Sequence, residues 1–339
     1  MSRETIVLDH LGGREAAARL VGGRLEDVLI DSDAPRVGTI YRAIADRPVK
    51  GQGGMFLRTP DGPAFLRQVR GLAPGQVLLV QVTGQAEPGK ALPVTQKLLF
   101  KSRYAIVTPD APGLNISRRI RDDDRRDVLI QIARSEMEGS AMGLILRSSC
   151  LDAEDDEIAE DIRAMADLAT AVMGDADGEA EVLTEGDGPH QLAWRDWSAP
   201  ADVITEPGGF EAEGVMDQLE QLGHPHVALS GGAMMYVEPT RALIAVDVNT
   251  GGDTSPAAGH KANLAAAREL PRQLRLRGLG GQITLDLAPM AKKDRRQFED
   301  ALRAAFRADP GETALVGWTP LGHYELQRKR DRAPLEVPS

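Results

Sequence analysis

Hydrophobic and polar residues alternate over short stretches in the first hundred residues, a pattern typical of β-strands with one buried face. The first thirty residues predict three strands separated by turns: Ile6–Leu8, Ala16–Leu20 and Leu25–Ile30. Between residues 37 and 97, five more are separated by turns rich in glycine, proline and aspartate: Gly38–Ala45, Gly54–Arg58, Ala64–Gln68, Val77–Thr83 and Ala91–Thr95. Five short strands at this even spacing indicate a small barrel.

Two aromatic residues of the predicted barrel are candidate contacts for a single-stranded nucleic acid. Phe56 and Phe65 fall near strand centres, and the basic residues around them are Lys50, Arg58, Arg67 and Lys90. Barrels of the oligonucleotide-binding (OB) type stack bases on aromatic rings while lysine or arginine holds the backbone. Two interpretations of each phenylalanine stay open, a stacking surface and the barrel core.

Strands and helices are mixed between residues 98 and 222. The predicted strands are Tyr104–Pro109, Met142–Leu146, Gln191–Trp197 and Asp202–Thr205. One helix is predicted to begin at Asp122–Asp124, with Val128, Leu129 and Ile132 on one face, and two more cover Asp152–Met173 and Phe210–Leu222. The polar, acidic stretch from residue 174 to 188 predicts a connector between modules.

The last third of the chain alternates strands and helices most regularly. In order, the predictions are the strands Ala233–Val237 and Ala242–Val248, a helix over about His260–Arg277, the strand Gln282–Leu287, the helix Lys293–Arg307 and the strand Ala314–Trp318. This order is typical of an α/β fold. The whole chain is therefore predicted to combine α/β and α+β subdomains.

Two strands of the last third end in polar side chains. The strand in ALIAVDVNTGG carries Asp247 and Asn249, which are two residues apart and so lie on one face of an extended chain. The strand in GGQITLDLAPM carries Asp286 near its carboxyl end. Strands joined by a crossover helix tend to lie parallel and close, with ligands at their carboxyl ends. We therefore expect these three side chains to converge.

Two carboxylates and an amide oxygen form an all-oxygen set of metal ligands. Mg²⁺ prefers such a set, with Mn²⁺ as a substitute, and a cation held there activates water and stabilises charge on a scissile phosphate. Glu238, across a predicted hairpin from Asp247, is a weaker candidate for an outer carboxylate. A single aspartate at a strand end more often caps a helix or turn, but two such strands beside basic segments favour the metal site.

The charge and the cysteine content reduce the number of possible functions further. The net charge of −11 argues against a surface that binds nucleic acid throughout, although four basic clusters indicate local anion-binding tracks. These clusters are ISRRIRDDDRR, LPRQLRLRGLGG, AKKDRR and ELQRKRDR. The single cysteine, Cys150, excludes an internal disulfide and a zinc knuckle. The first residues do not have the pattern of a secretory signal, and no apolar run is long enough to cross a membrane, so we expect a cytoplasmic protein.

These motifs resemble the bacterial ribonuclease E/G family. The shared order is a strand with Asp-x-Asn, a helix ending in QLRLRGLGG, and a second strand with Asp, and the similarity is most specific over NLAAARELPRQLRLRGLGGQITLDLAPM. The segments FKSRYAIVTPDAPGLNISRRI and MGLILRSS resemble those that form the family's pocket for an RNA 5′ monophosphate. The five-stranded region resembles the family's S1-type RNA-binding barrel.

The resemblance implies an organisation in four parts. Residues 1–36 and 181–229 would form a reduced ribonuclease H-like subdomain, into which the S1-like barrel of residues 37–97 is inserted. Residues 98–180 would form a region like the family's 5′ sensor. Residues 230–339 would form a DNase I-like α/β catalytic subdomain.

The resemblance also implies a Mg²⁺-dependent endoribonuclease acting on single-stranded RNA such as mRNA, rRNA or tRNA precursors. Cleavage would leave a 3′-hydroxyl and a 5′-phosphate, with stimulation by a 5′ monophosphate. Asp247 and Asp286 would hold the metal, and Asn249 would support it and orient the attacking water. The implied RNA contacts are Arg147, Ser148, Arg118 and Arg119 for the 5′ phosphate, and Phe56, Phe65 and Lys90 in the barrel.

The chain departs from the family pattern at several positions. Ser148 stands where the family usually has threonine, and Pro289 stands where it usually has another aspartate, three residues after Asp286. The cysteine pair that lets two family members share zinc is absent, so we expect a compact member without zinc and without the zinc-linked tetramer.

Two other functions are compared with the nuclease. Family members build the working site partly across the zinc-linked dimer, so an RNA-binding regulator that keeps the fold with little or no catalysis stays open. A small-molecule α/β enzyme is disfavoured, because the glycines at 251–252 and 278–281 form neither a GxGxxG nor a GxxxxGK[ST] phosphate loop after a strand.

Overall fold

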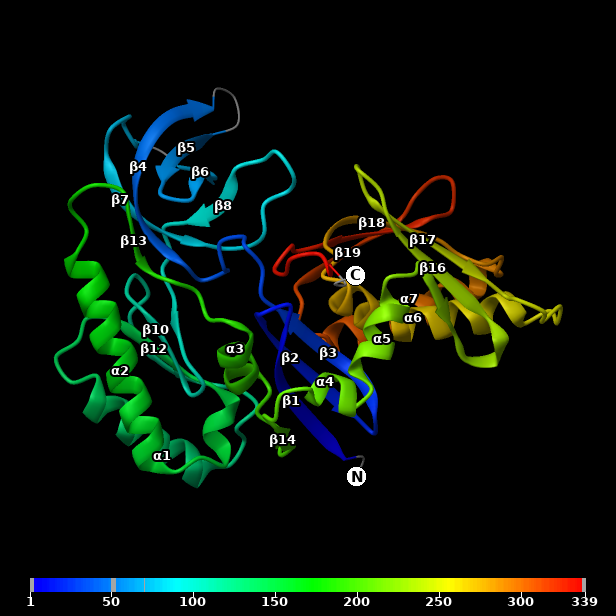
Figure 1. Cartoon of the computed structure of the whole chain (residues 1–339), viewed down its shortest axis with the longest axis horizontal. Coiled ribbons are helices and arrows are strands. Elements are labelled where there is room, and N and C mark those ends of the chain that lie inside the picture. The colour runs from blue at the N-terminus through cyan, green and yellow to red at the C-terminus, as the bar shows by residue number, and fades with distance from the viewer. Residues whose placement is uncertain (1–2, 50–52, 70, 337–339) are drawn as a thin grey trace. The chain divides into compact units, whose positions relative to one another are not determined.

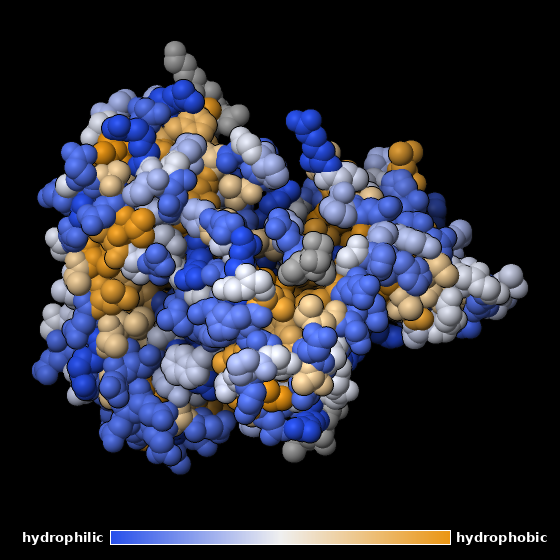
Figure 2. All heavy atoms as spheres, viewed as in Figure 1, coloured by the Kyte–Doolittle hydropathy of each residue, from blue (hydrophilic) through white to orange (hydrophobic). Residues whose placement is uncertain are grey.

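The computed structural model describes residues 3–49, 53–69 and 71–336, so Lys50 lies outside the described residues. The contacts divide the chain into two units, one of Met1–Ser32 with Ala201–Ser339 and one of Asp33–Pro200. Both units combine helices and sheets, which confirms the mixed α/β architecture (Figure 1). No helix in the described part of the chain is long and apolar enough to cross a membrane. Hydrophilic side chains surround smaller apolar groups on the face drawn in Figure 2.

A closed five-stranded β-barrel lies in the Asp33–Pro200 unit, as the even strand spacing predicted. The strands follow one another in the order β4, β5, β6, β8 and β7, and β7 pairs with β4 to close the barrel. Their bounds are β4 (Ile40–Val49), β5 (Gly54–Thr59), β6 (Gly62–Leu66), β7 (Val77–Val82) and β8 (Leu92–Thr95). Alternate side chains, among them Tyr41, Leu57 and Val80, are fully buried in the barrel core.

The acidic connector contains a strand that the sequence did not predict. β13 (Glu181–Thr184) pairs antiparallel with β4 beside the barrel. Arg42 of β4 holds this segment: its buried guanidinium group pairs with the carboxylates of Asp175 and Glu181 and donates to the Glu179 carbonyl. A polar sequence becomes a strand here because β4 supplies its backbone hydrogen bonds.

A four-stranded sheet and two helices form the second layer of this unit. The sheet order is β11, β12, β10, β9, with the bounds β9 (Phe100–Lys101), β10 (Ala105–Thr108), β11 (Leu114–Ile116) and β12 (Gly143–Leu146). Helix α1 (Asp123–Glu136) begins where the aspartates predicted, because Asp122 accepts a hydrogen bond from the Arg125 N–H. Helix α2 (Asp155–Gly174) packs its apolar face against the sheet.

Two local predictions in this unit are wrong. Gln191–Trp197 was predicted as a strand, but residues 191–196 belong to helix α3 (Pro189–Asp196) and Trp197 caps it. Proline suits its first turn, and the Gln191 side chain accepts a hydrogen bond from the Gly188 N–H. Val128 was predicted to share the buried face of α1 with Leu129 but is 36% exposed, because successive helical residues point about 100° apart.

A second four-stranded sheet, in the other unit, joins the start of the chain to the segment after residue 201. Its order is β14, β1, β2, β3, with the bounds β1 (Glu4–Leu11), β2 (Arg14–Val21), β3 (Arg24–Ile30) and β14 (Asp202–Ile204). The single helix predicted over Phe210–Leu222 is two helices, α4 (Gly209–Ala212) and α5 (Val215–Leu222). It is broken at Gly214, whose φ of +67° does not belong to a right-handed helix.

A six-stranded sheet with two helices on one face completes this unit. The sheet order is β15, β16, β17, β18, β20, β19, with the bounds β15 (His226–Ala228), β16 (Met234–Pro239), β17 (Ile244–Asn249), β18 (Gly281–Asp286), β19 (Thr313–Trp318) and β20 (Tyr324–Arg328). The helices are α6 (Ala258–Leu276) and α7 (Arg295–Ala308). Val246 and Val248 belong to the core that α6 and α7 cover, whereas Asp247 and Asn249 are exposed on the open face.

The sequence did not predict β15 or β20. The two units divide the chain at Ser32 and Ala201. Residues 181–200 lie in the barrel unit, since β13 pairs with β4.

A buried network of charges connects the two sheets of this unit. The Asp309 carboxylate, 1% exposed, lies between Arg275 of α6 and Arg328 of β20, 2.7 Å from the latter. Asp27 of β3 is equally buried, pairs with Arg332 and lies 3.6 Å from Arg275. Burial works against ionisation of Asp27, but Arg332 and Arg275 hold the pKa of its carboxyl group below the ordinary value.

Asp309→Asn removes the negative charge between two buried arginines without changing the size of the side chain. We expect the free energy of unfolding to fall by about 3–5 kcal/mol, because the buried Arg328 guanidinium group is left without a counter-charge. Urea denaturation followed by circular dichroism measures this loss. Asp300→Asn is the control: its pair with Arg303 is exposed, so its cost stays below about 1 kcal/mol. Equal losses in the two variants would contradict the expectation.

Candidate functional site

The open face of the six-stranded sheet brings two aspartates side by side. β17 and β18 run parallel, as the crossover through α6 predicted, and their register pairs Asp247 directly with Asp286. Neighbouring strands lie about 4.8 Å apart, and directly paired residues point to the same face. Both carboxylates are exposed at the carboxyl ends of their strands.

Asn249 holds the carboxylate of Asp247 in place. The Asn249 Nδ2 donates a hydrogen bond of 2.7 Å to Asp247 Oδ2, which leaves the Oδ1 atoms of both side chains outside this bond. The turn after β17 is fixed by Gly251, whose φ is +62°. A Cβ at Gly251 would lie 2.2 Å from the Gly232 carbonyl oxygen, so only glycine fits there.

The loop after Asp286 is held against the start of α6. The buried side chain of Asn263 binds both backbone polar groups of Ala288, donating to its carbonyl at 2.8 Å and accepting from its N–H at 3.0 Å. Gly259 lets the Pro289 carbonyl approach the helix, since a Cβ there would lie 2.0 Å from that oxygen. These contacts fix the carboxyl end of β18 and thereby the position of Asp286.

A histidine that the sequence did not single out lies beside Asp286. β18 and β20 pair antiparallel, with Leu285 facing Tyr324, which brings the preceding residue, His323, next to Asp286. His323 Nδ1 is 3.3 Å from Asp286 Oδ1 and has no hydrogen-bond partner in the described part of the chain. The position three residues after Asp286 is Pro289, which has no carboxylate, and the neighbour of Asp286 on the β20 side is the imidazole of His323. No sequence signal pointed to His323, because its place depends on the pairing of β20.

The chemistry of these ligands fits a hard divalent cation. Within the described residues, neither Asp247 nor Asp286 forms an ion pair with lysine or arginine, so both carboxylates are available. The described residues contain no group of three or more His, Cys, Asp or Glu side chains that could hold a metal. Mg²⁺ commonly uses one or two carboxylates and keeps water for its other positions, so a pair suffices. Glu238 is on the same strand pair but faces Ala245 rather than Asp247.

Most arginines of the basic clusters bind other groups of the fold. Their interpretation as contacts for a nucleic acid is therefore wrong for many of these side chains. On α6, Arg272 binds the Leu25 carbonyl and Arg277 binds the His224 carbonyl. Arg125 of α1 likewise binds the Cys150 carbonyl. Exposed cations of these clusters whose side chains have no partner in the described structure include Arg118, Arg119, Lys292, Lys293 and Arg296.

The segments predicted to bind a 5′ phosphate follow neighbouring strands. β11 and β12 run parallel; Arg118 and Arg119 come just after β11, and Arg147 and Ser148 come directly after β12. Arg118 and Arg119 are exposed, whereas Arg147 and Ser148 are partly buried. The structure therefore brings the two segments to one edge of the sheet.

The guanidinium group of Arg147 is already paired within the fold. It lies 2.7 Å from the Asp196 carboxylate and donates to the Ser102 carbonyl at 2.5 Å. Arg195 shares Asp196, at 2.9 Å. Burial works against ionisation of Asp196, but Arg195 and Arg147 hold the pKa of its carboxyl group below the ordinary value. An anion that binds Arg147 must compete with this carboxylate.

The two phenylalanines of the barrel form a pair on its outer surface. Phe56 and Phe65 face each other across β5 and β6, with ring centroids 5.3 Å apart, and both are only partly buried. The Arg47 guanidinium group lies 5.2 Å from the Phe56 centroid. Lys90, in the loop before β8, is 65% exposed and pairs with Glu87. The core interpretation of the phenylalanines is thus excluded, because neither ring belongs to the barrel core.

Paired alanine substitutions test this placement. Leu57→Ala removes a side chain that is 1% exposed and should lower the free energy of unfolding by about 2–5 kcal/mol, through lost burial and a cavity. Phe56→Ala on the same strand should cost only about 1 kcal/mol, because its ring is partly in water already. Urea denaturation provides both values. A cost at Phe56 as large as that at Leu57 would place the ring in the core.

Comparisons with known proteins agree on one family. The model of the ribonuclease E/G family matches residues 100–203 and 201–331. Ribonuclease E of Nostoc sp. (strain PCC 7120) is 25% identical over 388 residues, covering 97% of this chain and 56% of the relative. Ribonuclease G of Salmonella typhimurium (strain SL1344) is 26% identical over 388 residues, with 94% and 78% covered.

Ribonuclease E of Escherichia coli (strain K12) is 27% identical over 300 residues, covering 76% of this chain and 28% of the relative. The chain spans about half the length of the ribonucleases E of Nostoc sp. (strain PCC 7120) and Synechocystis sp. (strain PCC 6803) that it matches, 56% and 55%. The family match extends over well more than half of the chain and includes both strands that carry the paired aspartates. The chain therefore belongs to the ribonuclease E/G family.

Proposed function

We propose that this chain is a Mg²⁺-dependent endoribonuclease that hydrolyses single-stranded RNA, such as mRNA, rRNA or tRNA precursors. The observation that carries the proposal is the direct pairing of Asp247 with Asp286 on the open face of the sheet. Membership of the ribonuclease E/G family and relatives named ribonuclease E and ribonuclease G support it. The single, buried cysteine is consistent with a reducing, cytoplasmic setting.

In the proposed reaction, Asp247 and Asp286 hold the cation, and Asn249 fixes the orientation of Asp247 through its hydrogen bond. A bound Mg²⁺, with Mn²⁺ as a substitute, supplies an activated water and stabilises charge on the scissile phosphate. Lys292 and Lys293 are exposed after β18 and attract the RNA backbone. Hydrolysis adds hydroxide to phosphorus and a proton to the 3′ oxygen, which leaves 5′-phosphate and 3′-hydroxyl ends.

We propose for the parts of the chain the roles that the family resemblance implied. The barrel is proposed to be S1-like, with Phe56 and Phe65 stacking bases and Lys90 holding the backbone; the partly exposed rings support this. The four-stranded sheet with β1 is proposed to be a reduced ribonuclease H-like subdomain. The six-stranded sheet is proposed to be the DNase I-like catalytic subdomain.

A 5′ monophosphate is proposed to bind Arg147 and Ser148, with Arg118 and Arg119 beside them. Because Asp196 already pairs with Arg147, the phosphate has to displace this carboxylate. A dianionic phosphate gains more than a carboxylate from a guanidinium group and nearby cations, which allows the exchange. Stimulation by the 5′ end is therefore expected to be limited by Asp196.

Cleavage of a 5′-monophosphorylated, A/U-rich single-stranded oligonucleotide tests the metal site. Wild type should cut it in Mg²⁺ and not in EDTA, and Asp247→Asn should slow the reaction by roughly 100-fold or more, because stabilisation of several kcal/mol is lost. Asp217→Asn, an exposed acid on α5, is the control and should cut at the wild-type rate. Wild type that binds the RNA without cutting it, or that cuts it no faster than Asp247→Asn, would favour the RNA-binding regulator.

The 5′ pocket is tested by the ratio of cleavage rates on 5′-monophosphate and 5′-hydroxyl forms of the same RNA. Arg147→Ala should reduce this ratio to about one, since a charge-assisted hydrogen bond is worth about 1.5–3 kcal/mol. Asp196→Asn keeps the shape of the side chain but removes the competing charge, so it should raise the ratio above that of wild type. A ratio that neither substitution changes would place the 5′ end elsewhere.

A further inference from the structure

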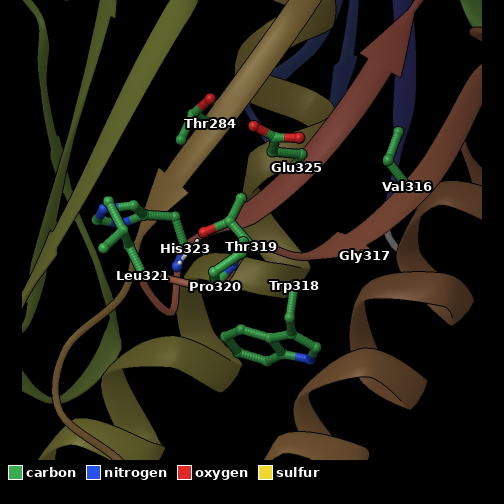
Figure 3. A pocket seen from close by; sticks show the side chains of 9 residues that line it. All are labelled: Thr284, Val316, Gly317, Trp318, Thr319, Pro320, Leu321, His323 and Glu325. Carbon is green, nitrogen blue, oxygen red and sulfur yellow. Dashed lines mark hydrogen bonds between the residues drawn. The ribbon is translucent and has the colours of Figure 1, made fainter.

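A pocket of about 660 Å³ opens where β18, β20 and β19 meet, and one of its lining residues, His323, lies 3.3 Å from Asp286. Its lining includes Thr284, Val316, Leu321, His323 and Glu325. Figure 3 shows the Thr284 and Glu325 side chains close together on one side of the sheet. The Trp318 ring points instead toward the helices, where it packs against Phe298 of α7.

The pocket contains a carboxylate without a partner. Glu325 is partly buried and faces Thr284 on β18 and Gly317 on β19. Gly317 has a φ of +131° and no side chain, and a Cβ there would meet nothing within 4 Å, so the space beside Glu325 stays open. In the described part of the chain, neither the Glu325 carboxylate nor the Thr284 hydroxyl forms a hydrogen bond or ion pair. Both groups are only partly buried, so water can reach them, and a ligand with donor groups can take the place of that water.

The rim of the pocket is apolar and unusually exposed. Leu321 is 87% exposed and Val316 is 64% exposed, the highest values among the large apolar side chains of the described residues. Val316 is the extra residue of a β-bulge, since the register of β19 shifts between Leu315 and Gly317. Bulges often redirect a side chain next to a site, and exposed apolar groups mark binding surfaces. A flat, apolar ligand surface would cover both side chains.

The distance between the pocket and the aspartates is no longer than one nucleotide. Thr284 precedes Asp286 by two residues on β18, so it is on the same face and about 6.6 Å away along the strand. His323 lines the pocket and also approaches Asp286. A nucleotide with its phosphate at the aspartates can therefore place its base in the pocket.

We propose that this pocket binds a base with an exocyclic amino group, adjacent to the scissile phosphate; the proposal rests on the nuclease function proposed above. Glu325 accepts a hydrogen bond from the amino group, and the Thr284 hydroxyl forms a second hydrogen bond with the base. Leu321 and Val316 contact the base plane. A carboxylate suits the amino groups of cytosine, adenine and guanine. It repels the carbonyl oxygen that uracil has in the place of the cytosine amino group, so Glu325 selects against uracil.

Methyl NMR on labelled protein tests the pocket without cleavage. The Leu321 and Val316 methyl signals are followed while the dinucleotides CpC and UpU, too short to reach other sites at the same time, are titrated in Ca²⁺. We expect CpC to bind about ten-fold more tightly than UpU, the size of one well-placed base contact. Glu325→Gln keeps the side-chain shape and should reduce this ratio to about two-fold or less. Glu312→Gln changes an exposed acid outside the pocket and should keep the wild-type ratio.

Cleavage provides the second readout. An RNA pool with randomised nucleotides around one site is cut in Mg²⁺ and the products are sequenced; uridine should be depleted at one flanking position in wild type and Glu312→Gln, but not in Glu325→Gln. Equal binding of CpC and UpU by wild type, or a preference that Glu325→Gln retains, overturns the pocket proposal. Base-selective binding without any Mg²⁺-dependent cleavage supports the pocket and overturns the nuclease function instead.

Discussion

The parallel pairing of β17 with β18 is the constraint on which the candidate site depends. Its register sets Asp247 beside Asp286 on the face that α6 and α7 leave open. A shift by one residue would turn Asp286 into the apolar core and Leu285 into water. The hydrophobic core therefore fixes the site: buried residues such as Val246 and Leu285 allow only the register in which both carboxylates face outward.

The part of the sequence most specific to the family turns out to support the fold rather than the chemistry. Arg275 and Arg277 in QLRLR are buried at the end of α6. Arg275 pairs with Asp309 and Asp27, which links the helix to both sheets of its unit, and Arg277 binds the His224 carbonyl. A buried arginine without a partner destabilises the fold. Each arginine of the motif therefore requires the residues with which it pairs. A motif can thus identify a family without containing its functional groups.

The open face has a second feature that follows from strand β20. Antiparallel pairing with β18 brings His323 beside Asp286 and Glu325 beside Thr284. Both side chains come from the end of the chain, yet they border the carboxylates contributed by β17 and β18. The same pairing places the bulge of β19 at the rim, so one hairpin supplies the imidazole, the carboxylate and the apolar contacts of the pocket.

The sequence by itself determined the barrel strands, the long helices and the strands that carry Asp247, Asn249 and Asp286, because residue periodicity and turn residues are local signals. Tertiary structure decided β13 and β20, short segments that pair with distant strands, and α3, where a helical cap outweighed an apparent strand pattern. It also decided that most clustered arginines are internal and that the barrel phenylalanines are external. Those outcomes depend on which distant residue faces each side chain, and no local pattern specifies that.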